Sequence, residues 1–156
     1  MRNAPVIYIV VPCYNEEEVL PLTAEFLGKK LDDLTRSRRI HPGSRVLMVD
    51  DGSKDRTWKL IEKLHEKDER FAGVKLSRNR GHQNALLAGL FEAARRRCDA
   101  AISMDADLQD PPSLLPKMLE ILATGEYDSV ATRRVNREGE PPIRSFFARQ
   151  FYKLIN

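Results

Sequence analysis

Two carboxylates with a spacing typical of divalent-cation sites stand at the end of a short apolar run, residues 100–104. Residues two apart in an extended chain point to the same face, so Asp105 and Asp107 should project together from one strand end. Such close carboxylates repel each other unless a cation or hydrogen-bond donors lie between them. Mg²⁺ or Mn²⁺ meets this need with one or two carboxylates, water and phosphate oxygens. Gln109 could add a further oxygen, and a plain Asp-rich turn is the alternative.

Three other polar stretches follow apolar runs or precede a helix. Residues 12–16 (PCYNE) and 50–53 (DDGS) each have a simpler interpretation as turns or helix caps. Residues 77–82 (SRNRGH) place two arginines before a helix start, where a pyrophosphate could bind. His82 is a further candidate for contact with a substrate.

Apolar runs alternate with segments of helical period along the chain. We expect strands at residues 6–11, 46–49, 73–76, 100–104 and 129–132. We expect helices at residues 16–34, 54–67 (with Ser53 or Asp55 as N-cap), 81–97 and 112–123. This order predicts an α/β fold with a mostly parallel sheet and helices on both faces. Ligands bind beyond the carboxyl ends of such strands, where residues 12–16, 50–53 and 105–109 would meet.

The composition suits one domain, with 42% hydrophobic residues in 156. The 26 basic and 23 acidic residues nearly balance, so no nucleic-acid partner is predicted. Cys13 and Cys98 lack metal or redox spacing and are expected to be buried thiols in a reducing compartment. We find neither a signal peptide nor 18 consecutive apolar residues, so we expect no membrane span in this chain.

The tail, residues 133–153, holds six basic and two acidic residues, together with several aromatic side chains. Such a segment is typical of a helix lying on a membrane surface, with an ordinary helix packed on the sheet as the alternative. An exposed apolar tail could also pair with a second copy of the chain, giving a homo-oligomer.

The motifs together resemble those of family 2 glycosyltransferases. They stand at residues 11–16 (VPCYNE), 49–57 (VDDGSKDRT), 76–82 (LSRNRGH) and 104–112 (MDADLQDPP). Within that family they are most similar to the polyprenyl-phosphate sugar transferases, which include dolichyl-phosphate mannose synthase and bactoprenol glucosyltransferases. The tail is similar to the bactoprenol (undecaprenyl-phosphate) branch. The resemblance covers essentially the whole chain and implies a GT-A type, Rossmann-like fold.

The resemblance also implies roles for individual residues. The nucleotide would contact Pro12, Tyr14, Glu16, Asp50, Asp51, Arg78 and Asp105. The metal, Mg²⁺ or Mn²⁺, would be held by Asp105, Asp107 and Gln109. The acceptor phosphate would meet Arg133, Arg144, Ser145 and Arg149. Catalysis would depend on Asp107 and Arg133. A lipid phosphate is already ionised at neutral pH, so we assign no catalytic base.

The implied function is inverting transfer of a sugar to a polyprenyl (undecaprenyl) phosphate at the cytoplasmic face of the cell membrane. UDP-glucose is the first choice of donor, followed by UDP-N-acetylglucosamine, other UDP-sugars and GDP-mannose. Such relatives continue into further catalytic chain and membrane helices, so we expect this chain to be the N-terminal catalytic portion. Residues 1–132 would form the nucleotide-sugar-binding core, and residues 133–156 the start of the acceptor and membrane-interface segment.

Two alternatives stay open on the sequence. A nucleotide-sugar-binding module without turnover would bind the donor and transfer nothing. A sugar-nucleotide nucleotidyltransferase would need a Gly-rich basic loop after the first strand, where this chain has PCYNE. An EF-hand is excluded, because the characteristic Gly and terminal Glu do not follow the Asp pair.

Overall fold

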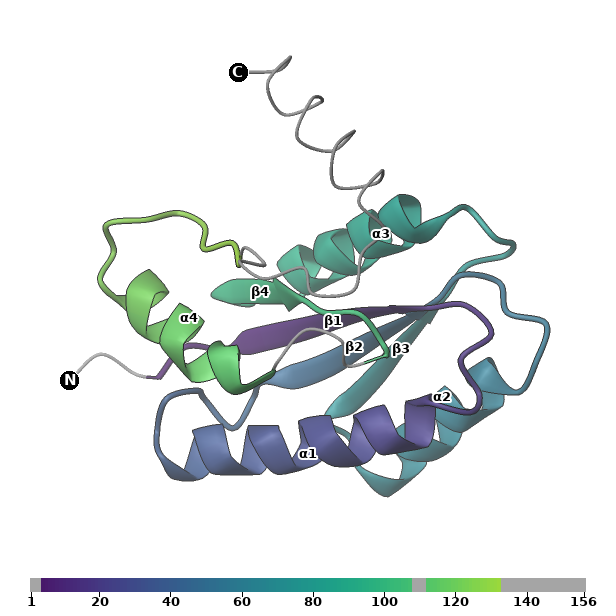
Figure 1. Ribbon diagram of the computed structural model, residues 1–156, viewed down its shortest axis with the longest axis horizontal. Helices are drawn as coiled ribbons and strands as arrows, with labels where there is room; N and C mark the ends of the chain where they lie inside the picture. The colour runs from purple at the N-terminus through teal and green to yellow at the C-terminus, as the bar shows by residue number, and fades with distance from the viewer. Residues whose placement is uncertain (1–3, 108–111, 133–156) are drawn as a thin grey trace, which may run out of the picture. The chain divides into compact units, whose positions relative to one another are not determined.

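The computed structural model describes residues 4–107 and 112–132, in which strands and helices alternate (Figure 1). The elements are β1 Ile7–Cys13, α1 Leu20–Arg36, β2 Arg45–Asp50, α2 Thr57–Lys67, β3 Phe71–Lys75, α3 His82–Arg95, β4 Ala100–Ser103, the 3₁₀ turn Pro112–Leu114 and α4 Leu115–Ala123. By its contacts the chain divides into two units, Met1–Glu120 and Ile121–Asn156. All the site residues described below belong to the first unit.

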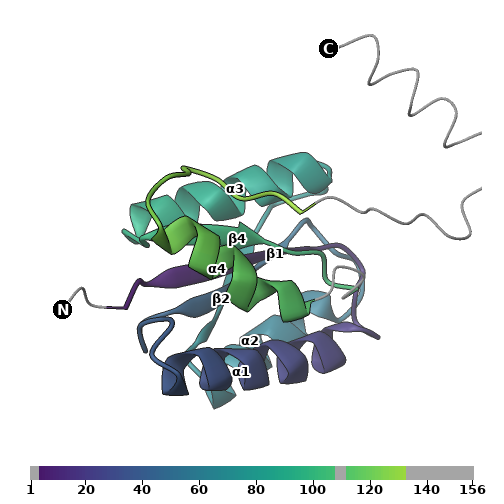
Figure 2. The ribbon, with the colours of Figure 1, turned by 60° about the vertical axis from the view of Figure 1, so that its left-hand side comes forward.

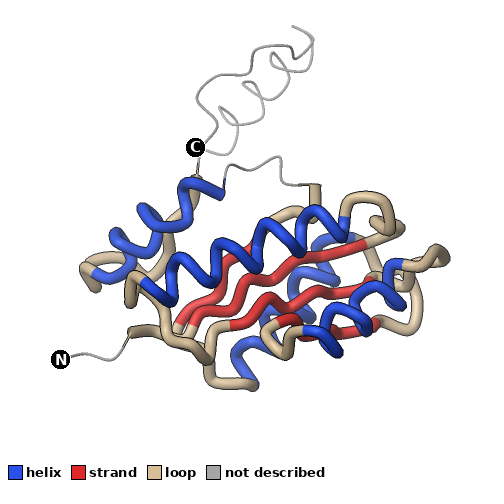
Figure 3. Tube along the Cα trace, turned by 90° about the horizontal axis from the view of Figure 1, so that it is seen from below, coloured by secondary structure: helices blue, strands red, loops and turns tan. Residues whose placement is uncertain are grey.

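The strands form one parallel sheet in the order β3-β2-β1-β4, as labelled in Figure 1. Figure 3 draws these strands side by side in red. Helices α1 and α2 cover one face and α3 covers the other (Figure 1, Figure 2). The strand order reverses beside β1, because the chain builds outward through β2 and β3 and then returns to the other side of β1. The predicted α/β parallel sheet is confirmed, and its switch point lies between β1 and β4, where such sheets bind ligands.

Strand β1 is buried along its whole length because helices cover both of its faces. Ile7, Ile9 and Val11 point into the core beneath α1 and α2. Tyr8 and Val10 point into the core beneath α3. β1 therefore anchors both cores and fixes where the loop after Cys13 begins.

Strand β4 differs from expectation, because the sequence predicted a buried strand there. Ala101 and Ser103 are exposed, and the other two residues of the strand are half-buried. Ala101 and Ser103 pair in register with Tyr8 and Val10 of β1. The side chains of Tyr8 and Val10 lie on the face of the sheet that α3 covers. β4 is an edge strand among the described residues, and α3 does not shield its outer part.

The predicted fifth strand at residues 129–132 is not observed, because those residues have no regular secondary structure. A strand needs a ladder partner, and in the described chain β4 pairs with β1 alone. The predicted boundary between residues 132 and 133 stays a prediction, since residues 133–156 lie outside the described residues. Within residues 4–107 and 112–132, no helix is long and apolar enough to cross a membrane.

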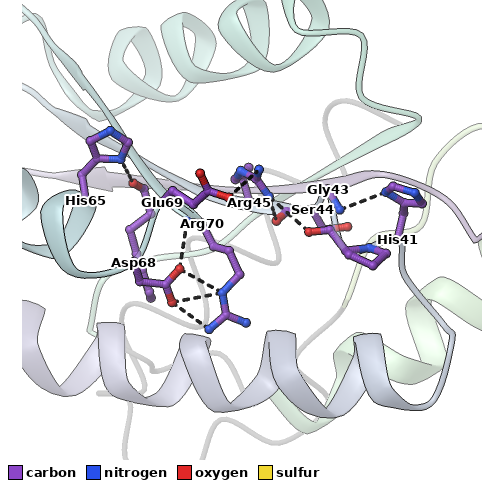
Figure 4. A network of polar contacts seen from close by, with 10 residues as sticks. His41, Gly43, Ser44, Arg45, His65, Asp68, Glu69 and Arg70 are labelled. Carbon is purple, nitrogen blue, oxygen red and sulfur yellow. Dashed lines mark hydrogen bonds and ion pairs between the residues drawn. The ribbon is translucent and has the colours of Figure 1, made fainter.

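Charged side chains at the amino-terminal edge of the sheet pair with one another (Figure 4). The Arg70 guanidinium lies 2.7 Å from the Asp68 carboxylate and 2.6 Å from that of Asp32. Arg45 faces Glu69 at 3.9 Å. These pairs lie where β2 and β3 begin, and one of them joins Arg70 to helix α1. The carboxyl edge, by contrast, carries acids that crowd one another.

Candidate functional site

The loops after β1, β2 and β4 start next to one another at the carboxyl edge of the sheet. The backbone N–H of Asp51 donates to the carbonyl of Cys13 at 2.8 Å, and that of Met104 donates to Val10 at 3.0 Å. These bonds continue the sheet ladder one residue beyond the strands. The described parts of the three polar stretches predicted to meet, residues 12–16, 50–53 and 105–107, therefore start side by side at this edge.

The loop after β1 is tied to the loop after β2 by side chain to backbone hydrogen bonds. The N–H of Asn15 donates to Ser53 Oγ at 3.0 Å, and Asn15 Oδ1 accepts from the N–H of Lys54 at 2.9 Å. The N–H of Glu16 donates to the buried hydroxyl oxygen of Thr57 at 2.9 Å. Because the β2–α2 loop and the start of α2 both hold this loop, Tyr14 and Glu16 occupy defined positions beside β1.

Asp55, one of the two N-caps expected from the sequence, adds to the same connection, but the N-cap position of α2 is Arg56, which makes no side-chain capping hydrogen bond. The Asp55 carboxylate accepts the N–H of Thr57 at 2.9 Å and the N–H of Glu17 at 3.1 Å. Arg56 in turn donates its Nε to Glu17 at 2.9 Å. Helix α2 begins at Thr57 rather than residue 54, and the residues before it serve the contact with the β1–α1 loop.

The acidic turn after β4 has the two-sided arrangement that its sequence predicts. Met104 and Ala106 are buried in the core beneath α1, whereas Asp105 and Asp107 are exposed. The hydroxyl of Thr23, on α1, donates to the carbonyl oxygen of Ala106. The two carboxylates therefore lie on the open side of a turn whose other side is anchored in the core.

Glu16 lies close enough to this turn to feel its charge. Its pKa is raised first by partial burial and then by the negative charges of Asp107, Asp55 and Asp105. Carboxylates from the loops after β1 and β4 thus crowd one place at the switch point. This excess of negative charge suits a divalent cation.

The two carboxylates fit a cation whose remaining coordination positions are filled by oxygen atoms of a substrate and water. Within residues 4–107 and 112–132, no cluster of three or more His, Cys, Asp or Glu side chains could enclose a metal ion. Mg²⁺ and Mn²⁺ need fewer protein ligands, because water and phosphate oxygens complete their shell. Asp105 and Asp107 match that use, and Gln109 lies outside the described residues.

The adjacent acids Asp50 and Asp51 have different surroundings. Asp50 is fully buried, its Oδ1 accepts the N–H of Ser53 at 3.2 Å, and its Oδ2 has no hydrogen-bond partner among the described residues. Asp51 uses both carboxylate oxygens, which accept the N–H groups of Arg80 at 2.7 Å and Gly81 at 2.9 Å. Asp50 therefore keeps an unused acceptor, whereas Asp51 fastens the loop before α3.

That loop brings Arg78 and His82 to the same edge of the sheet. The backbone of Arg78 packs against Gly52, and His82 Nε2 lies 3.6 Å from Asp105 Oδ1. A small cavity of about 70 Å³ lies here, lined by Pro12, His82, Leu86, Ser103, Met104 and Asp105. It opens between β1, β4 and the start of α3, beside the acidic turn.

Comparison with known families decides the class of protein. A model of glycosyl transferase family 2 matches residues 8–153. The chain belongs to glycosyl transferase family 2.

Two relatives illustrate the match to this family. The chain is 43% identical over 155 residues to an uncharacterized glycosyltransferase, YkoT, of Bacillus subtilis strain 168, covering 99% of this chain and 45% of the relative. It is 38% identical over 149 residues to undecaprenyl-phosphate 4-deoxy-4-formamido-L-arabinose transferase of Pectobacterium carotovorum subsp. carotovorum strain PC1, covering 95% and 41%. The chain thus spans less than half the length of these relatives.

A solved structure shares the fold. The mannosyltransferase PcManGT from Pyrobaculum calidifontis, in complex with GDP-Man and Mn²⁺, aligns with a TM-score of 0.50 and 24% identity. The alignment covers 69% of this chain and 33% of that one. The α/β fold of the GT-A type that the family resemblance implied is confirmed.

The described residues that the family resemblance assigned to the nucleotide or the metal lie at the carboxyl edge of the sheet. They are Pro12, Tyr14, Glu16, Asp50, Asp51, Arg78, Asp105 and Asp107. The remaining expected residues lie outside the described residues, namely Gln109, Arg133, Arg144, Ser145 and Arg149. Sequence reasoning did not assign any site role to Thr23, Glu17 or Thr57, which hold the site's loops.

Proposed function

We propose that this chain forms the donor-binding part of an inverting glycosyltransferase, which moves a sugar from a nucleoside diphosphate sugar to a polyprenyl phosphate. The observation that carries the proposal is the exposed Asp105–Asp107 pair at the β1/β4 switch point, close to Glu16. Family membership supplies the reaction class.

The nucleoside would lie over the loops after β1 and β2. Asp50 supports this placement, because its buried Oδ2 lacks a hydrogen-bond donor that a nucleobase N–H could provide. Pro12, Tyr14 and Glu16 would form the neighbouring wall. Both carboxylate oxygens of Asp51 are engaged by backbone N–H groups, so we now propose that it holds the loop and does not contact the nucleotide.

The diphosphate would lie between the acidic pair and the loop before α3. Asp105 and Asp107, with Gln109, would hold Mg²⁺ or Mn²⁺, and Arg78 would add positive charge. A bound cation would offset the charge that develops on the leaving diphosphate. The solved mannosyltransferase holds GDP-Man and Mn²⁺, and we propose the same two ligand classes here.

The proposed acceptor is a polyprenyl phosphate, undecaprenyl phosphate first. The Pectobacterium relative's name specifies undecaprenyl phosphate, which supports this class. Arg133, Arg144, Ser145 and Arg149 would meet the acceptor phosphate, with Arg133 contributing to catalysis together with Asp107. The phosphate is its own nucleophile, so the protein must mainly hold it in line with the anomeric carbon.

Isothermal titration of UDP, GDP, UDP-glucose and GDP-mannose tests the donor site, with Mn²⁺ or with EDTA. We expect metal-dependent binding of a uridine ligand that is lost in Asp107→Asn. The surface variant Asp33→Asn on α1 should bind as wild type does. Binding that is equal in EDTA would contradict the metal role, and the absence of nucleotide binding would contradict the donor site.

The alternative of a binding module without turnover makes a different prediction. It predicts the same titration result but no transfer of radiolabelled sugar to undecaprenyl phosphate. The measurement belongs on a chain as long as the relatives, because this one spans less than half of them. The match to glycosyl transferase family 2 favours sugar transfer over a sugar-nucleotide nucleotidyltransferase.

We further propose that residues 133–156 contact the cytoplasmic face of the membrane and that this segment can pair two copies of the chain. Co-sedimentation with anionic vesicles should occur for residues 1–156 and be lost for residues 1–132. Sedimentation velocity should show a dimer for the longer chain alone. Equal behaviour of the two chains would contradict both ideas.

A further inference from the structure

Thr23 joins α1 to the acidic turn, although 83 residues separate the two in the chain. Its hydroxyl donates to the carbonyl oxygen of Ala106, the residue between Asp105 and Asp107. Thr23 is 1% exposed and Ala106 is 4% exposed. Bulk water therefore cannot replace this hydrogen bond when it is lost.

The contact serves the turn more than the helix. Thr23 Oγ1 also lies 3.1 Å from the carbonyl of Val19, the usual partner of a helical threonine four residues earlier. Helix α1 can thus satisfy this hydroxyl by itself. The buried carbonyl of Ala106 gains the donor that it needs, since an unpaired buried carbonyl is costly.

The bond fixes the turn just where the sheet ladder stops. Met104 makes the last ladder bond, donating its N–H to Val10 at 3.0 Å. Ala106 follows Met104 by two residues, and its carbonyl accepts a hydrogen bond from Thr23. The side chains of Met104 and Ala106 both lie in the core. The hydrogen bond therefore restrains the peptide that joins Ala106 to Asp107, within the turn that carries both carboxylates.

The same end of α1 also supports Glu16. The carbonyl of Glu16 accepts the N–H of Leu20 at 2.9 Å, less than one turn before Thr23. One helix end thus holds both sides of the acidic cluster, Glu16 directly and the Asp pair through Ala106.

We propose that Thr23 is a positioning residue for the cation site, which it serves through the Ala106 carbonyl without touching a ligand. This inference rests on the proposed function, because it assumes that Asp105 and Asp107 hold the metal. It predicts that removing the hydroxyl weakens cation binding while the fold remains.

The experiment measures Mn²⁺ binding by electron paramagnetic resonance in wild type, Thr23→Val and Thr23→Ser. Valine nearly matches threonine in shape but lacks the hydroxyl, whereas serine retains it. We expect Mn²⁺ to bind Thr23→Val about threefold to tenfold more weakly, the range for one lost hydrogen bond. Thr23→Ser should stay within about twofold of wild type, because it can still donate to Ala106.

Thr35→Val is the matched control, a threonine on the same helix placed away from the acidic turn. It should bind Mn²⁺ as wild type does. Thermal melting followed by circular dichroism confirms that each variant is folded before binding is measured. Should Thr23→Val not fold, Thr23→Ser and Thr23→Ala carry the comparison.

Each outcome separates this inference from the function on which it rests. Wild-type affinity in Thr23→Val overturns the positioning role and leaves the proposed function standing. Equal losses in Thr23→Val and Thr23→Ser also overturn it, because the hydroxyl would then not be the cause. If wild type binds no Mn²⁺, or if Asp107→Asn does not weaken binding, the metal site itself is wrong and the inference falls with it.

Discussion

Asp51 Oδ1 accepts the backbone N–H of Arg80 at 2.7 Å, which fastens the β2–α2 loop to the loop before α3. The second carboxylate oxygen accepts the N–H of Gly81. In Asp51→Asn an NH₂ group would face one of these N–H donors. We expect this change to lower the free energy of unfolding by about 1–3 kcal/mol. It should also speed tryptic cleavage after Arg78 and Arg80.

Urea denaturation and limited proteolysis with mass spectrometry measure the two effects. Asp33→Asn is the control, because its side chain is 65% exposed and faces Arg36 at 3.7 Å. A surface pair of this kind should change stability by less than about 1 kcal/mol. Unchanged cleavage at Arg78 and Arg80 in Asp51→Asn would show that Asp51 does not hold the loop.

Gly52 lets the same two loops approach each other closely. Its φ is +69°, and an added Cβ would lie 2.5 Å from the carbonyl carbon of Arg78. Gly52→Ala therefore combines left-handed strain with a backbone clash. We expect a loss in unfolding free energy of more than about 2 kcal/mol, since the left-handed conformation alone costs roughly 1–2.

Gly125→Ala separates the two causes. Its φ of +74° is similar, but a Cβ there would meet nothing within 4 Å. We expect the smaller, conformational loss alone, as measured by chemical denaturation. If Gly52→Ala costs no more than Gly125→Ala, the close approach of the loops is not important for stability.

Glu16 should make the protein less stable as pH rises in the absence of metal. Its pKa is raised above 4.5, mainly by partial burial and then by Asp107, so the folded chain binds this proton more tightly than the unfolded chain. The stability that the Glu16 carboxyl contributes is present at pH values below the ordinary carboxyl pKa of the unfolded chain. It is lost as pH rises through the raised pKa of the folded chain. Glu16→Gln has no such proton to lose.

Thermal melts in EDTA from about pH 4 to about pH 7 test this effect, a range that spans ordinary and raised carboxyl pKa values. The stability of Glu16→Gln relative to wild type should grow with pH across that range. Glu18→Gln, an exposed neighbour with the same charge change, is the control. A constant difference for Glu16→Gln would contradict the crowding of acids at the switch point.

Cys13 should be chemically silent in the folded protein. It is 1% exposed, and burial raises its pKa to about 12, with Glu16 and Asp50 adding in the same direction. The thiolate is the reactive form, so little of it exists at neutral pH. In Cys98→Ser, a thiol-reactive dye should label the chain only after denaturant is added. Rapid labelling of the native variant would mean that the end of β1 opens readily.

The features that sequence could predict are local and periodic. The uniformly apolar run before Cys13 indicated a strand covered on both faces, and the alternation of Met104 and Ala106 with two aspartates indicated which side chains face outward. These patterns depend on neighbours a few residues away. The parallel sheet followed from the strand and helix order.

The features that sequence did not reveal depend on long-range contacts. Thr23 fitted the apolar stripe of α1, and only the fold shows that its hydroxyl reaches Ala106. Asp51 has the same residue type as Asp50, but the position of the loop 29 residues later decides its role. A polar residue on a core-facing helix stripe was the available signal for Thr23. The predicted strand at residues 129–132 failed for a related reason, because a short segment containing β-branched residues does not reveal whether a pairing strand exists.

The connection between the first two loops also limits which amino acids position 15 can accept. Asn15 has a φ of +55°, donates its N–H to Ser53 and accepts from Lys54 through its side chain. Glycine would suit the backbone but lose the side-chain acceptor, and most other residues would disfavour the backbone. Natural variation here should be confined to asparagine and aspartate, so substitution tolerance at this position would report whether the two loops stay joined in a homologue.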